Sequence, residues 1–200
     1  FAKNTKYRSE KVLLGIEVGM QPAAAPEDNK MIKAHPFDEV IGSMHCVLGK
    51  DIYEPTAYEG MDKDTRVRTY LEDTIRCLLL YPDFDTLGHI DYICRYMPYE
   101  DKNLYYKEHA DLWDKVFSML AEKNKAIEIN TRRLSDKSVI SPLLTLYKRF
   151  KELGGKYMTL GSDAHYQEHV GRAIDVAADI ARESGLRIVH FKERKMIIDE

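Results

Sequence analysis

Residues 156–165 read Lys-Tyr-Met-Thr-Leu-Gly-Ser-Asp-Ala-His, a short apolar run followed by a cluster of polar side chains. The apolar run is typical of a β-strand that ends at its glycine, and a helical pattern begins near Gly171. Asp163 and His165 are therefore expected at the rim of a sheet. A carboxylate and a neutral imidazole two residues apart can bind one metal ion or two adjacent ions, and they suit Zn, Mn or Fe. The simpler alternative is that Ser162 or Asp163 caps the following helix and that His165 is an ordinary loop residue.

Three other apolar runs end in the same way. They read Leu-Leu-Gly-Ile-Glu at 13–17, Ile-Gly-Ser-Met-His at 41–45 and Thr-Leu-Gly-His at 86–89, so each ends on a residue type that binds metals. Histidines scattered through a core would not all follow apolar runs. In parallel α/β proteins the carboxyl ends of the strands meet at one edge, where ligands bind. The residues expected to share this rim and to bind cations are Glu17, His45, His89, Asp163 and His165.

The composition places the chain among ordinary soluble proteins and narrows its possible partners. Apolar residues make up 44% of the 200 positions and charged residues 32%, which favours one domain over residues 1–200. The formal net charge of -3 gives no general attraction to nucleic acid. We therefore expect a small substrate rather than a nucleic-acid partner.

Two further features bear on the location of the protein. No apolar run reaches the length of a membrane span and no leader with a cleavage site is present, so we expect a cytoplasmic protein. Cys46, Cys77 and Cys94 form an odd set without a Cys-x-x-Cys pair, which is typical of reduced thiols. The chain begins with Phe1 and soon enters a predicted strand, so we expect it to be a piece of a longer protein.

The periodicity of apolar residues predicts strands that alternate with helices. After a loop or helix end over residues 1–11, the predicted strands are 12–17, 40–47, 84–90, 126–130, 157–160, 187–191 and 195–198. The predicted helices are 27–34, 65–81, 104–123, one that starts at Ser141-Pro142 and ends before Gly154-Gly155, and one around 173–181. This order predicts parallel βα units with right-handed crossovers. Because several strands end in ligand types and no glycine-rich phosphate loop is present, an incomplete βα barrel is favoured over a nucleotide-binding sheet.

Four motifs, in this order along the chain, carry a family resemblance. Gly-Ile-Glu at 15–17, Gly-Ser-Met-His at 42–45, Gly-His-Ile-Asp at 88–91 and Gly-Ser-Asp-Ala-His at 161–165 resemble the later motifs of the PHP family of metal-dependent phosphoesterases. The resemblance spans residues 14–172. Gly-His-Ile-Asp-Tyr with Arg-Tyr shortly after, and Glu-Ile-Asn-Thr at 128–131, are similar to the histidinol-phosphatase branch.

The resemblance implies a distorted (β/α)7 TIM-like barrel with up to three divalent metal ions. It makes Glu17 a bridging carboxylate, places His45 and His89 on one metal, Asp163 on another and His165 on the third. The family also has an initial His-x-His motif and a second strand that ends in an acid and a histidine. No histidine precedes His35 in this sequence, so we expect the C-terminal three quarters of the barrel without its first strands, and two depleted metal positions.

The implied chemistry is hydrolysis of a phosphate monoester, which adjacent metal ions promote by lowering the pKa of a bound water and by offsetting negative charge. Glu17, Asp163 and His165 are the expected catalytic residues, and the two on the last motif could pass a proton to the leaving group. Arg95 and Arg132 follow strands, so their guanidinium groups could grip phosphate oxygens from rim loops.

Each substrate-binding assignment has a simpler alternative. Either arginine could be a solvated surface residue, and Arg133 and Arg172 are close competitors. Asn130, at a strand end, either contacts the substrate or holds a turn.

The leading hypothesis is a phosphatase that converts L-histidinol phosphate to L-histidinol and phosphate in histidine biosynthesis. One alternative keeps the metals but changes the substrate to a nucleotide or a nucleic-acid end. Another is a catalytically incomplete fragment that only binds metal. The sequence leaves the metal identity and the oligomeric state open.

Overall fold

Seven strands pair into one curved sheet in the computed structural model, which describes residues 5–199. Their order across the sheet is β1-β2-β5-β6-β7-β8-β9. The strands are β1 (Ile16–Gly19), β2 (Val40–Ser43), β5 (Thr86–Leu87), β6 (Ala126–Asn130), β7 (Tyr157–Gly161), β8 (Arg187–Lys192) and β9 (Lys195–Ile198). The first six are parallel, which confirms the predicted α/β class and mostly parallel sheet, while closure of the barrel stays a prediction. Residues 1–4 of the predicted N-terminal loop or helix end lie outside the described part.

The last strand departs from the prediction of parallel units throughout. β9 is antiparallel to β8, and only Glu193 and Arg194 separate the two strands. Both residues have positive φ values, 54° and 62°, as two-residue hairpin turns of the primed type require. The main-chain N–H of Arg194 donates to the carbonyl of Asp38 at 2.9 Å, so this hairpin contacts the segment before β2.

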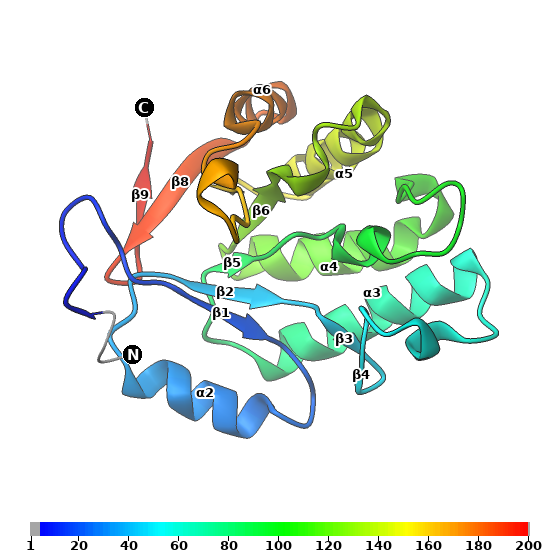
Figure 1. Ribbon diagram of the computed structural model, residues 1–200, viewed down its shortest axis with the longest axis horizontal. Helices are drawn as coiled ribbons and strands as arrows, with labels where there is room; N and C mark the ends of the chain where they lie inside the picture. Colours follow the sequence, from blue (N-terminus) through cyan, green and yellow to red (C-terminus); the bar gives the residue numbers. More distant parts are fainter. Residues whose placement is uncertain (1–4, 200) are drawn as a thin grey trace.

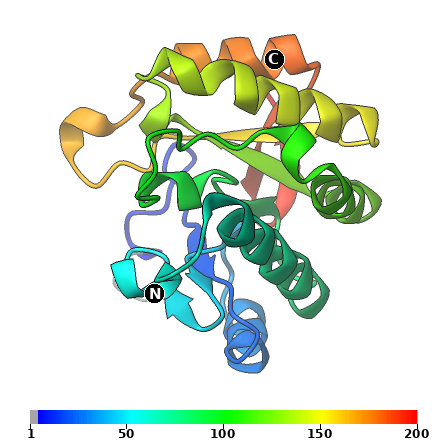
Figure 2. The same ribbon diagram turned by 90° about the vertical axis from the view of Figure 1, so that its right-hand side faces the viewer.

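Five helices lie along the outer, convex side of the sheet (Figures 1 and 2). They are α2 (Ala25–Ala34), α3 (Lys63–Leu80), α4 (Ala110–Glu122), α5 (Ile140–Glu152) and α6 (Ile174–Ser184). All five were predicted, but α4 begins at Ala110 rather than Leu104. The backbone of His109, with φ -139° and ψ 45°, is not helical and interrupts the helix there, and a short 3-10 turn precedes it. None of the helices in the described part is long and apolar enough for a membrane span.

The main core lies between the sheet and these helices. The rings of Trp113 and Phe117 on α4 are stacked at 5.3 Å, and Phe117 meets Phe150 of α5 at 5.7 Å. All three side chains are buried, as is Met158 of β7. Each such side chain contributes about 1.5–3 kcal/mol through burial, so this contact fixes the helices and the strands beneath them.

Two of the predicted strands have different bounds in the structure. β1 begins at Ile16 rather than Val12, because the main-chain N–H of Leu14 donates to the carboxylate of Asp38 (2.7 Å) instead of a neighbouring strand. The predicted strand 40–47 stops at Ser43 and is followed by a hairpin of β3 (Cys46–Val47) and β4 (Lys50–Asp51). Glu17 therefore lies within β1, and the residues after β2 and β5 form loops at the same edge.

Candidate metal centre

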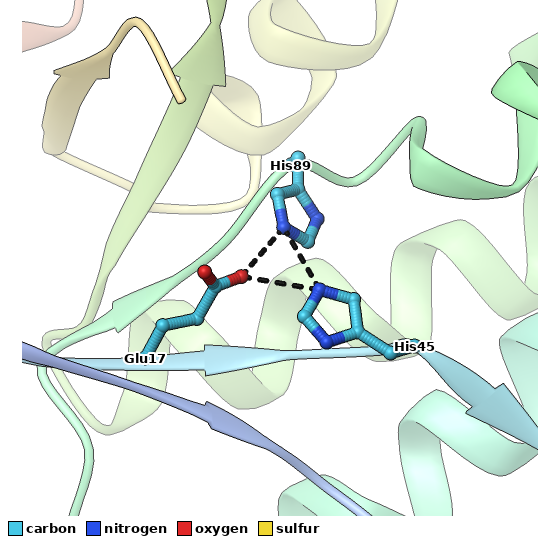
Figure 3. A group of neighbouring side chains, drawn as sticks. All are labelled: Glu17, His45 and His89. Atoms are coloured by element: carbon cyan, nitrogen blue, oxygen red, sulfur yellow. Dashed lines mark hydrogen bonds and ion pairs between the residues drawn. The ribbon is translucent and has the colours of Figure 1, made fainter. Parts of the chain in front are cut away.

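Glu17 lies in β1, and His45 and His89 follow the neighbouring strands β2 and β5; the three side chains point toward one another (Figure 3). Oε1 of Glu17 lies 2.8 Å from Nε2 of His89 and 3.1 Å from Nε2 of His45. The two Nε2 atoms are 3.3 Å apart. One carboxylate oxygen and two imidazole nitrogens thus converge within 4.8 Å, a donor set that a zinc-type cation accepts.

Mutual hydrogen bonds shift the protonation of this cluster. The rings of His45 and His89 hold the pKa of Glu17 well below its ordinary value, although burial opposes this effect. Burial is the largest single effect on His89 and lowers its pKa, but the hydrogen bond to Glu17 and the negative charges of Glu128 and Glu17 together outweigh burial, so the pKa is raised from its ordinary value. The carboxylate therefore favours a proton on a neighbouring ring, and a divalent cation could take the place of that proton.

Local packing explains why glycine precedes His89. A Cβ at Gly88 would lie 2.5 Å from Oγ of Ser43 and 2.9 Å from Cγ2 of Ile41, both on the adjacent β2. Only a glycine lets β5 approach β2 this closely, and that approach places His89 beside His45.

The other predicted ligands, Asp163 and His165, lie after β7 and border the same pocket. Its volume is about 180 Å³, and it is lined by Glu17, His45, His89, Tyr92, Arg95, Tyr96, Arg132, Asp163 and His165. The structure thus brings all five predicted ligand residues to one pocket, but only Glu17, His45 and His89 form a compact ligand group within the described part. The roles of Asp163 and His165 as metal ligands stay predictions.

Asp163 faces two guanidinium groups. Its Oδ2 lies 2.8 Å from Nη1 of Arg95 and 3.5 Å from Nη1 of Arg132. Its φ of 50° places it in the left-handed region, which is uncommon for a residue other than glycine. His165 turns back, with Nδ1 2.9 Å from the carbonyl oxygen of Asp163. The helix-cap alternative is wrong, because α6 begins at Ile174 and its N-cap residue is Ala173.

The predicted substrate-binding residues form one hydrogen-bonded unit. Oδ1 of Asn130 accepts from Nη2 of Arg95 and from the main-chain N–H of Arg132, both at 3.0 Å. Asn130 is buried and holds the turn after β6, as its alternative reading proposed, and it also orients Arg95. Arg133 instead donates to Asp91 at 2.9 Å, and the competitor Arg172 is exposed.

Glu128 and Tyr92 are neighbours of the cluster to which the sequence reading gave no firm role. Oε2 of Glu128 accepts the main-chain N–H of His89 at 2.6 Å, and the side chain is buried. The ring of Tyr92 lies 4.6 Å from that of His45 and 4.9 Å from that of His89. A charged residue inside the apolar run Ala-Ile-Glu-Ile-Asn was the available signal for Glu128.

Comparison with known proteins gives consistent results. A family model described as the PHP domain matches residues 1–132. The probable histidinol-phosphatase of Clostridium acetobutylicum is 40% identical over 196 residues, which are 98% of this chain and 77% of that protein. The histidinol-phosphatase of Lactococcus lactis is 33% identical over 176 residues, which are 88% of this chain and 65% of that protein.

A solved structure extends the likeness to three dimensions. The crystal structure of histidinol phosphate phosphatase from Lactococcus lactis, complexed with zinc, L-histidinol and phosphate, matches with a TM-score of 0.87 at 30% identity. The match covers 100% of this chain and 76% of that one. The shared fold, the match over residues 1–132 and a relative that is 40% identical along nearly the whole sequence show that this chain belongs to the PHP domain family.

Proposed function

We propose that this chain is a metal-dependent phosphomonoesterase that hydrolyses L-histidinol phosphate to L-histidinol and phosphate. The observation that carries the proposal is a single pocket in which the ligand group of Glu17, His45 and His89 lies beside Arg95 and Arg132. Cation ligands and guanidinium groups side by side suit a phosphate ester, whose oxygens need both. The names of the relatives and the zinc, histidinol and phosphate of the Lactococcus structure support this substrate.

In this proposal Glu17, His45 and His89 hold one divalent cation, and Asp163 and His165 contribute to further cations. Bound cations supply a water of lowered pKa and offset the charge of the ester. The side chain of His89 is only 4% exposed while that of Glu17 is 41% exposed, so the cluster is buried on the side of His89 and open toward the pocket on the side of Glu17. Asp163 or His165 accepts the proton that the attacking water loses and passes it to the leaving alkoxide, which is the predicted catalytic role of the last motif.

Arg95 is the main phosphate-binding residue in this proposal. Its side chain is 10% exposed, and its guanidinium group lies 5.0 Å from the ring of Tyr92 and donates to Asn130, so its direction is fixed. Arg132 is 48% exposed and reaches the pocket from the rim. A largely buried guanidinium group and a half-exposed one can bind phosphate from two sides.

The proposal includes a single domain over residues 1–200, a cytoplasmic location and a small metabolite rather than nucleic acid or a membrane as partner. A pocket of about 180 Å³ supports a small substrate. Cys46, Cys77 and Cys94 are all free thiols, which supports a reducing compartment.

The test is release of phosphate from L-histidinol phosphate by the purified protein with Zn or Mn, with metal content measured in parallel. A mononucleotide and a 3′-phosphorylated DNA oligomer serve as competing substrates. Efficient cleavage of either one without cleavage of L-histidinol phosphate would show that the substrate is wrong. Bound metal without hydrolysis of any ester would instead identify a metal-binding module.

A further inference from the structure

Glu128 is a buried carboxylate directly beneath the candidate metal centre. It lies in the middle of β6 and is 6% exposed. Its Oε2 accepts the main-chain N–H of His89 at 2.6 Å, and its own carbonyl oxygen accepts the hydroxyl of Tyr147 at 3.0 Å. Both its side chain and its backbone are therefore held in place.

Glycines face this carboxylate at the ends of the neighbouring strands β5 and β7. A Cβ at Gly161 of β7 would lie 1.8 Å from Oε1 of Glu128. A Cβ at Gly88, which precedes His89, would lie 3.6 Å from Oε2. The carboxylate thus occupies the space that a side chain at Gly161 would need, between the end of β5 and the end of β7.

His89 needs such a partner because β5 is short. The ladder between β2 and β5 pairs only two residues of each strand, and Gly88 makes the next main-chain hydrogen bond, to Gly42 at 2.9 Å. The N–H of His89 lies one residue further on and donates to the side chain of Glu128 instead of a main-chain carbonyl of a neighbouring strand. A buried N–H without an acceptor is unfavourable, so this bond fixes the path of the chain at His89.

We infer that Glu128 is a positioning residue that sets the affinity of the metal centre by holding the backbone of His89, so that Nε2 of this histidine faces Glu17. This inference rests on the proposed function, in which His89 is a metal ligand. Glu128 acts here through the reach of its acceptor oxygen, because it accepts the main-chain N–H of His89, whereas Nε2 of the His89 ring faces Glu17. Groups that orient metal ligands in this way typically change metal affinity by about 10–100-fold when altered.

Two substitutions separate the effect of the length of the Glu128 side chain from the effect of its charge. Glu128→Gln removes the charge but keeps an oxygen in the position that accepts the N–H of His89. Glu128→Asp keeps the charge but shortens the side chain by one carbon–carbon bond, about 1.5 Å, which withdraws the acceptor. We expect Glu128→Asp to weaken zinc binding by about tenfold or more and Glu128→Gln to stay within about threefold of the wild type.

The measurement is the zinc dissociation constant of the whole chain, obtained by competition with a chromophoric chelator. Glu39 provides the matched control, since it is a half-buried acid just before β2 whose Oε1 accepts the hydroxyl of Thr86 at 2.7 Å. Glu39→Gln and Glu39→Asp should leave zinc affinity unchanged. Circular dichroism and melting temperature show whether each variant is folded, and Glu128→Gln alone still tests the inference if Glu128→Asp does not fold.

The outcomes are distinct. Wild-type zinc affinity in a folded Glu128→Asp variant would overturn the inference, and so would a tenfold loss in Glu128→Gln, which would assign the effect to charge. If the wild type hydrolyses L-histidinol phosphate, the zinc concentration for half-maximal activity should rise in Glu128→Asp far more than kcat falls at saturating zinc. If the wild type binds zinc but hydrolyses nothing, the proposed function fails while the zinc constants still decide the role of Glu128.

Discussion

Replacing Gly161 by alanine tests whether the carboxylate of Glu128 is as confined as its surroundings indicate. The new Cβ would lie 1.8 Å from Oε1 and 2.8 Å from Cδ of Glu128, whereas real Cβ contacts are essentially never shorter than 3.0 Å. The φ of Gly161 lies outside the left-handed region, so alanine adds no backbone strain of its own. Any loss of stability therefore comes from the contact.

The size of the loss follows from what Glu128 must give up. Overpacking of a filled site costs about 1–3 kcal/mol, and a displaced carboxylate leaves the buried N–H of His89 without an acceptor, which costs about 1–3 kcal/mol more. Gly161→Ala should therefore lower the free energy of unfolding by about 2–6 kcal/mol. For a chain of this size that is a fall of roughly 4–24 °C in melting temperature.

A double-mutant cycle measured by thermal unfolding in EDTA provides the assay. In Glu128→Ala the carboxylate is absent, so the further change Gly161→Ala should cost less than about 1 kcal/mol. Equal losses from Gly161→Ala in both backgrounds, or no loss in the wild type, would refute the reasoning. Either result would mean that the carboxylate can move aside without loss.

Three further predictions concern the pocket and its support. Without metal, the pair of Glu17 and His89 should be most stabilising between about pH 4.5 and 6.5. The pKa of Glu17 is lowered by folding, so its contribution to stability is lost as pH falls through the pKa of the folded state. The pKa of His89 is raised by folding, so its contribution is lost as pH rises through the pKa of the folded state. Urea unfolding in EDTA as a function of pH, compared with His89→Gln, checks both limits. Arg132→Ala should raise KM for L-histidinol phosphate about tenfold with an unchanged melting temperature, because this side chain is half exposed; a melting temperature lowered by several degrees would contradict this. Tyr147→Phe should lose about 1 kcal/mol of stability in chemical unfolding through its hydrogen bond to the carbonyl of Glu128, with zinc affinity unchanged, and a tenfold change in zinc affinity would contradict this.

The sequence predicts the sheet well where local pattern and tertiary structure agree. The runs 126–130 and 195–198 are strands with the predicted bounds. Both are short apolar runs flanked by polar or turn residues, a pattern that favours a strand with ends at those residues. The meeting of Glu17, His45 and His89 was also predictable. Parallel strands bring their carboxyl ends to one edge, so residues at equivalent ends become neighbours whatever their separation along the chain.

The sequence could not predict where individual strands leave the sheet or where their hydrogen-bonded pairing ends. The pattern of residues 40–47 continues past Ser43, but the chain leaves the sheet there to form the hairpin of β3 and β4. The role of Glu128 depends on how short β5 is, since a longer strand would have paired the N–H of His89 with a neighbouring strand. Periodicity reports which side chains face inward, but it does not report where a hydrogen-bonded ladder stops.

The ion pairs of Asp163 with Arg95 and Arg132 bear on its predicted role as a metal ligand. Glu17 is hydrogen-bonded to the two imidazoles, and Asp163 is paired with Arg95 and Arg132, so the groups that would bind cations and phosphate in the proposed reaction are paired with one another here. Under the proposed function, a phosphate group takes the guanidinium groups and leaves Asp163 free for a cation. Because linkage is reciprocal, a cation on Asp163 equally frees Arg95 for phosphate. Cations and phosphate should therefore favour each other's binding, and the arginine contacts of Asp163 are compatible with its predicted role as a metal ligand.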